Sequence, residues 1–259
     1  MNENKTPKKK KAGGLIWLIA ILLVVVPGFF LAQILLEDKG ARDEYEQIEQ
    51  QFTAPAVNSE PEGHQLKTID WAGLQAQNKD VIGWIQMDAI EILDYPIVKG
   101  EDNGVYLNHS YTGAYRPAGA IFMEHQNAAT FGDLHTIIYG HNVQDGSMFG
   151  GLTRYMEEDF FKENGGSFYL YTPAGIWRYD IFSVEKVGSE DPGVYTIGFL
   201  PGEEYAAFLQ GMKDRSVYDT GVEVDENDYV ITLSTCVTGT SQSDERIVVH
   251  AKCMKQLAG

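Results

Sequence analysis

The chain contains few cysteines and few basic residues. Among 259 residues there are two Cys, which excludes a small scaffold held together by disulfides. Lys and Arg together number 20 against 37 Asp and Glu, so the formal net charge is -17. Such an acidic surface repels phosphate backbones, which argues against a nucleic-acid partner. The length suits one domain of about 200 residues with an appendage.

Common metal-binding motifs are also missing. The sequence has no CxxC or HExxH pattern, and His109, His125, His135 and His141 lack the spacing of zinc ligands. Internal repeats and low-complexity tracts are absent too. We therefore expect neither a metal ion nor another cofactor.

An uncharged segment lies near the N-terminus. Residues 15–36 carry one polar side chain, Gln33, and a helix of that length spans about 33 Å, enough for a bilayer core of about 30 Å. Five lysines within residues 1–14 precede it, and this asymmetry predicts a cytoplasmic tail followed by an extracellular remainder. The alternative is a cleaved signal peptide, whose apolar region usually has about 7–15 residues. The longer run favours an uncleaved transmembrane anchor.

A stalk is expected to follow the anchor. Residues 37–51 are charged and rich in Glu and Gln, which predicts a solvated helix, and residues 52–67 include two Pro and one Gly, which is typical of a linker. We therefore divide the chain into a tail, an anchor, a stalk over 37–67 and a folded domain over 68–259. That domain is expected to begin with a short helix over 69–78, capped by Thr68 or Asp70.

The folded domain shows mainly strand-like patterns. Short apolar, β-branched and aromatic runs alternate with turn residues, which predicts an all-β barrel or sandwich. The eight runs are Ile82–Met87, Ile92–Val98, Ala118–Met123, His135–Tyr139, Ser167–Thr172, Ile176–Val187, Tyr229–Thr235 and Arg246–Met254. Three helical stretches interrupt them, at Asn103–His109, Met148–Glu163 and Pro201–Arg215. The long 188–228 connection carries the last of these, and either a substrate cover or a packed insertion would explain it.

Three polar residues are predicted to meet at strand ends. Cys236 ends one run, and Arg246 begins the next strand. If the two strands are antiparallel neighbours, both residues lie at one rim of the sheet. His141 ends a third run, where Gly140 marks the opening into a loop.

This trio suits acyl transfer. A thiol has an ordinary pKa near 8.5, so a neighbouring imidazole is needed to take its proton and later to protonate a leaving amine. A guanidinium can hold a substrate carbonyl or a developing oxyanion. Each signal alone is weak, since a lone Cys is more often a small buried hydrophobe. For Cys253 an inert buried thiol is favoured over a disulfide with Cys236.

The residues together resemble the sortases, the membrane-anchored cysteine transpeptidases of Gram-positive bacteria. The resemblance covers roughly residues 66–255 and rests on Thr232-Leu-Ser-Thr-Cys236, on Arg246 and on Tyr139-Gly-His-Asn142. The Thr-Leu-Ser-Thr-Cys form, the Ile121–Met123 strand and the 138–149 stretch are similar to class B of that family.

The resemblance implies an eight-stranded β-barrel with peripheral helices. It implies that Cys236 attacks the Thr carbonyl of a C-terminal sorting motif on a secreted protein, that His141 is the general acid and base, and that Arg246 holds substrate and oxyanion. An amine of a peptidoglycan precursor or a pilin subunit would resolve the thioacyl-enzyme. By the same resemblance, the residues that contact the motif are Ser234, Asn103 and Leu107.

Two other functions remain open at this point. A cysteine peptidase would use the same trio with water as the acceptor, and a membrane-tethered scaffold barrel would use Cys236 only for packing. When an amine acceptor is added, a transpeptidase gives a ligated product and a peptidase does not. A Cys236 thiol that resists alkylation in the folded protein would favour the scaffold.

Overall fold

The computed structural model describes residues 23–29, 40, 42–56, 64–236 and 244–258. The chain divides into two compact units, Met1–Asp43 and Glu44–Gly259, and each is described by itself. In the first unit residues 23–29 are helical, and the rest of the predicted 15–36 anchor lies outside the described residues. Among the described residues no helix has both the length and the apolar character needed to cross a membrane.

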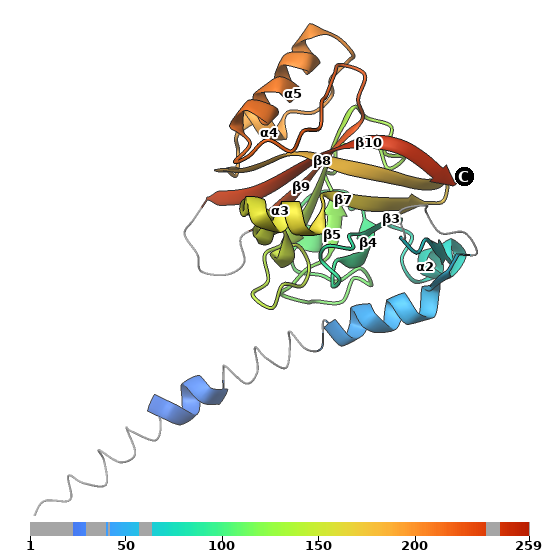
Figure 1. The fold of residues 1–259 in the computed structure, drawn as a ribbon. Helices are drawn as coiled ribbons and strands as arrows, with labels where there is room; N and C mark the ends of the chain where they lie inside the picture. Colours follow the sequence, from blue (N-terminus) through green and yellow to red (C-terminus); the bar gives the residue numbers. More distant parts are fainter. Residues whose placement is uncertain (1–22, 30–39, 41, 57–63, 237–243, 259) are drawn as a thin grey trace, which may run out of the picture. The chain divides into compact units, whose positions relative to one another are not determined.

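The second unit is built on a closed β-barrel of eight strands (Figure 1). The strands are β3 (Val81–Gln86), β4 (Asp94–Val98), β5 (Ile121–Met123), β6 (His135–His141), β7 (Ser167–Thr172), β8 (Gly175–Gly188), β9 (Val230–Cys236) and β10 (Glu245–Ala258). Around the barrel they follow the order β10-β8-β7-β3-β4-β5-β6-β9, and β9 pairs with β10 to close it. Every predicted run corresponds to one strand, which confirms the expected barrel.

Short helices surround the barrel. They are α2 (Trp71–Gln77), α3 (Glu158–Asn164), α4 (Pro192–Tyr195) and α5 (Glu203–Arg215), with 3-10 turns η1 (Val105–Leu107) and η2 (Gly150–Met156). Asp70 caps α2 by accepting a hydrogen bond from the Gly73 amide at 3.0 Å. The predicted 148–163 helix is divided at Glu157, whose extended backbone separates η2 from α3.

The segment before α2 differs from the solvated stalk that its charges suggest. Residues 42–52 are helical, and Tyr45, Ile48 and Phe52 are buried in the main core. These residues recur at helical spacing and form one apolar face, which packs despite the surrounding Glu and Gln. Strand β1 (Thr53–Pro55) then pairs with β2 (Lys67–Ile69). The proposed boundary at residue 68 stays a prediction, but the contacts extend the compact unit back to residue 44.

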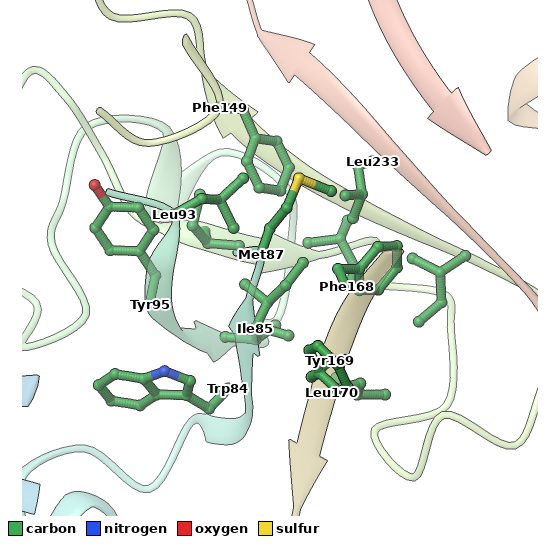
Figure 2. Close-up of a cluster of buried hydrophobic side chains, with 14 of the residues drawn as sticks. Trp84, Ile85, Met87, Leu93, Tyr95, Phe149, Phe168, Tyr169, Leu170 and Leu233 are labelled. Carbon is green, nitrogen blue, oxygen red and sulfur yellow. The ribbon is translucent and has the colours of Figure 1, made fainter. Parts of the chain in front are cut away.

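The inside of the barrel is apolar. Met87, Phe149 and Leu233 lie together in Figure 2, and all three are almost completely buried. Alternation along the strands supplies this interior, because every second residue points to the same face.

Part of the outer face is covered by the connection between β8 and β9. Helix α5 packs on β8, with Tyr205, Leu209 and Met212 buried against Phe182 and Val230. Val194 of α4 is buried in a smaller cluster with Val187 and Val248. In Figure 1 α4 and α5 lie together on one side of the barrel (orange). The 188–228 connection therefore packs on the barrel wall through α4 and α5, and its role as a substrate cover stays a prediction.

Leu233 offers a direct test of this core. The Leu233→Ala change removes a fully buried side chain from β9, and we expect the free energy of unfolding to fall by about 3 kcal/mol. The matched control is Leu200→Ala, since Leu200 is 82% exposed, and it should change stability by less than about 0.5 kcal/mol. Urea unfolding of the two variants measures the difference. Equal losses would contradict the assignment of Leu233 to the core.

Candidate active site

The site is organised by the parallel pairing of β6 with β9. Its ladder runs from His135 opposite Val230 to His141 opposite Cys236. Paired strands lie about 4.8 Å apart, so the backbones of His141 and Cys236 are direct neighbours at the end of the ladder. Two residues from distant parts of the sequence are thus brought together by main-chain hydrogen bonds.

Gly140 explains why β6 can continue to His141. A Cβ atom at this position would lie 2.6 Å from both Ile121 Cδ1 and Phe149 Cγ, which is too close for any side chain. The glycine therefore lets Phe149 pack directly on the strand, and the Phe149 amide donates to the His141 carbonyl at 2.9 Å. The expected opening of the chain at Gly140 is wrong, because the strand includes both residues.

His141 has an environment that favours its neutral form. The side chain is buried, and neither ring nitrogen has a hydrogen-bond partner in the part of the chain that the structure describes. Burial lowers the pKa of His141 below its ordinary value, and the positive charge of Arg246 lowers it further. The nearby Leu107 carbonyl raises the pKa, although it does not reach hydrogen-bond geometry with the ring. A neutral imidazole with unoccupied nitrogens is ready to accept a proton.

Arg246 reaches the same region from the next strand. Antiparallel β10 pairs with β9 from Lys252 opposite Val230 to Val248 opposite Ser234, so the ladder ends two residues short of Arg246 and Cys236. The antiparallel pairing of the two strands is confirmed, and the meeting of Arg246 with Cys236 stays a prediction. The Arg246 side chain is half-buried, and its Nη1 donates to the Glu245 carbonyl at 3.2 Å.

A groove of about 140 Å³ lies beside these strand ends. It is open to solvent and combines aromatic walls with a few polar groups, which is typical of a peptide or small-molecule site. The lining residues are Asn103, Leu107, Phe122, Tyr139, Ser189, Tyr195, Ser234 and Arg246.

The structure brings all three predicted substrate-contacting residues to this groove. Leu107 is 37% exposed and adds an apolar wall from η1. Ser234 is almost completely buried, and its hydroxyl lies 2.9 Å from the Tyr195 hydroxyl. The Asn103 side chain donates to Glu124 at 2.5 Å and accepts from the His125 amide at 2.9 Å, so it is held in a fixed orientation.

Other groove residues could not be found by sequence reasoning. Tyr139 comes from β6, and Tyr195 lies in α4, 39 residues before Ser234 in sequence. Beneath them Glu124 accepts hydrogen bonds from Asn103 and from the Tyr139 hydroxyl at 3.0 Å. No local motif marks Glu124, because its role depends on the packing of β5 against β6.

Cys253 lies away from the groove, in the part of β10 that pairs with Tyr179 of β8. Its thiol is free and half-buried, and burial raises its pKa, which keeps it protonated and poorly reactive. This agrees with the inert thiol expected from the sequence. Among the described residues no cluster of His, Cys, Asp and Glu has the arrangement of a metal site.

Comparisons with known proteins agree with this geometry. A Sortase domain family model matches residues 85–254. Sortase B of Staphylococcus aureus is 31% identical over 241 residues, which cover 93% of this chain and 96% of that protein. Sortase B of Listeria monocytogenes is 32% identical over 246 residues, which cover 94% of this chain and 97% of that protein.

Solved structures give the same result for the fold. Sortase B from B. anthracis in complex with AAEK1 superposes with a TM-score of 0.72 at 31% identity, over 85% of this chain and 99% of that one. The Staphylococcus aureus sortase B–substrate complex superposes with a TM-score of 0.71 at 30% identity, again over 85% and 99%. The chain therefore belongs to the sortase family of cysteine transpeptidases, and within that family to class B.

Proposed function

We propose that the chain cleaves a C-terminal sorting motif of secreted proteins after Thr and transfers the cleaved protein to an amine acceptor. One observation carries the proposal: the β6–β9 register sets the backbone of His141 beside that of Cys236, and Arg246 of β10 lines the groove beside these strand ends. Nucleophile, proton carrier and anion-binding group are the three parts that acyl transfer needs.

The first half of the reaction forms a thioester. His141 takes the proton of the Cys236 thiol as the sulfur attacks the Thr carbonyl carbon, and the carbonyl oxygen becomes an oxyanion facing Arg246. When the intermediate collapses, the C–N bond breaks and His141 gives its proton to the departing amine. The low pKa of His141 fits this cycle, because the imidazole is neutral before the attack.

In the second half an acceptor amine attacks the thioester. The amine transfers a proton to His141, the C–S bond breaks, and the Cys236 sulfur recovers a proton from the imidazole. The peptide that delivers the Thr lies in the groove between Leu107, Asn103 and Ser234. The Staphylococcus aureus sortase B–substrate complex, which has the same fold, supports a substrate-binding function for this chain.

The cellular setting follows from the N-terminal sequence. The uncharged segment 15–36, preceded by lysines, supports a single membrane anchor with the N-terminus in the cytoplasm and the barrel outside. An extracellular barrel tethered to the membrane would meet secreted substrates as they emerge. The amine acceptor is then a peptidoglycan precursor or a pilin subunit, both of which are available outside the cell.

Replacing Cys236 with Ala tests the nucleophile. We expect the variant to lose both cleavage and ligation of fluorogenic sorting-motif peptides, while thermal unfolding matches that of the wild type. Cys253→Ala serves as the control and should retain activity, because that thiol lies outside the groove. Assays run with and without an amine acceptor separate ligation from hydrolysis. Wild-type cleavage rates in Cys236→Ala would contradict the assignment.

Arg246 is tested by a change that keeps its charge. Arg246→Lys retains one positive charge but loses the planar fork of donors, and we expect kcat/KM to fall about 100-fold. Arg178→Lys is the matched control, since Arg178 pairs with Asp180 on β8 outside the groove. Steady-state kinetics on one peptide measure both. Similar losses in both variants would show that a general destabilisation is responsible.

The titration of His141 tests the electrostatics. Its pKa should lie below the ordinary 6.5, because burial and Arg246 both disfavour the imidazolium. Activity should therefore rise with pH through this lowered pKa. NMR titration of the ring in a Cys236→Ala background measures the pKa directly. Adding Arg246→Gln should raise it, and an unchanged pKa would exclude Arg246 as a cause.

A further inference from the structure

A line of polar side chains is buried beneath the connection between β8 and β9. It crosses four neighbouring strands of the barrel wall, with one residue on each: His135 on β6, Thr232 on β9, His250 on β10 and Glu185 on β8. All four are at most 2% exposed. Buried polar groups are costly unless they bond to one another, so their partners indicate what they hold in place.

The partners form a continuous series. The His135 Nε2 lies 2.7 Å from the Thr232 hydroxyl, which lies 2.8 Å from His250 Nδ1. His250 Nε2 lies 3.0 Å from the Glu185 carboxylate. Arg215 of α5 donates two hydrogen bonds to the same carboxylate, from Nε at 2.7 Å and from Nη2 at 3.0 Å. We name these five residues the buried polar chain.

Both ends of the buried polar chain reach the same short segment. At one end His135 Nδ1 donates to the Thr196 carbonyl at 2.8 Å, and at the other Arg215 Nη2 donates to the Gly193 carbonyl at 2.8 Å. Gly193 lies within α4 and Thr196 directly follows it, and the four residues of this helix are too few to be stable alone. The segment around α4 therefore depends on these two attachments.

That segment is also one wall of the groove. Ser189 and Tyr195 line the groove together with Arg246, and the Tyr195 hydroxyl lies 2.9 Å from Ser234. A displacement of α4 would move Tyr195 away from Ser234 and widen the groove beside the strand ends.

Thr232 is the central link of the series. The Thr196 carbonyl can only accept, so His135 carries its hydrogen on Nδ1, and burial lowers the pKa of His135 to about 4, which keeps the ring neutral. His135 Nε2 is then an acceptor, and the Thr232 hydroxyl must donate to it. The same oxygen lies 2.8 Å from His250 Nδ1, and the other ring nitrogen of His250 faces the Glu185 carboxylate. Loss of the Thr232 hydroxyl would therefore divide the buried polar chain into two unconnected parts.

We propose that the buried polar chain positions residues 189–196 as a wall of the substrate groove, so that His135, Thr232, His250, Glu185 and Arg215 are positioning residues for binding of the sorting peptide. The inference rests on the proposed function for its substrate. Its structural part, the fixing of α4, can be measured without any catalysis.

The test uses the full chain and the variants Thr232→Val and Thr232→Ser. Valine has the shape of threonine without the hydroxyl, whereas serine keeps the hydroxyl. We expect Thr232→Val to raise KM for a cleaved sorting-motif peptide about tenfold, with kcat within about twofold, since one hydrogen-bond link contributes about that factor. Thr232→Ser should restore a KM close to that of the wild type.

Ser183→Ala is the matched control. Its hydroxyl is equally buried in β8 and donates to the Met212 carbonyl of α5 at 2.7 Å, so it anchors the same connection without touching α4. This variant should lose stability but keep the wild-type KM. If KM rises equally in Ser183→Ala and Thr232→Val, or stays constant in both, the positioning role is overturned.

A second variant covers the case in which Thr232→Val does not fold. Arg215 lies at the outer end of the buried polar chain, and its side chain is 39% exposed. Arg215→Lys keeps a positive charge beside Glu185 but cannot also reach the Gly193 carbonyl. We expect KM to rise here too, and an unchanged KM would count against the proposal.

Hydrogen exchange provides the readout that does not need activity. In Thr232→Val the amides of residues 191–196 should exchange at least tenfold faster than in the wild type, while those of α5 change less. Ser183→Ala should show the reverse pattern. Unchanged exchange of α4 would overturn the positioning role even if the wild-type chain cleaved peptides. Faster exchange with no peptide cleaved would uphold the fixing of α4 and count against the proposed function instead.

Discussion

The active site depends on one contact, the parallel pairing of β6 with β9. Residues 142–229 separate the two strands in sequence, and no turn or hairpin brings them together. Their ladder ends with His141 opposite Cys236, and the antiparallel β9–β10 pair adds Arg246 from the next strand. Three neighbouring strands of a closed barrel thus hold the reacting groups on a rigid frame, and the groove forms where their ends meet the surrounding loops.

The barrel wall lies between two packed layers, an apolar core inside the barrel and a partly polar layer outside it. Inside it, Leu233 and its neighbours form an apolar core. Outside it, α4 and α5 cover a second face whose strands carry histidine, threonine and glutamate. The catalytic strands separate these two layers, so the same strands that close the core also present polar side chains to the connection between β8 and β9. This arrangement explains how a packed insertion far from the core can still form a wall of the groove.

Much of the fold could be predicted from the sequence, because each strand has its own alternating pattern and the antiparallel return from Cys236 to Arg246 is local. The burial of the helix over 42–52 could not, since its charged residues conceal the apolar face of Tyr45, Ile48 and Phe52. His141 was identified, but its place inside β6 depends on the contact between Gly140 and Phe149. Thr232 and His250 alternate with apolar residues along β9 and β10, and this pattern is typical of a strand face exposed to solvent. Only the structure shows that the connection between β8 and β9 covers this face.

The central claim is that Cys236 forms the acyl bond. Intact-protein mass spectrometry tests it most directly: the full chain is mixed with a sorting-motif peptide without an acceptor amine, and the adduct is located by peptide mapping. We predict a mass gain equal to the peptide fragment that ends at Thr less one water, carried by Cys236 and released by hydroxylamine. An adduct on Cys253, or cleavage of the peptide that proceeds at the same rate after Cys236 has been alkylated, would contradict it.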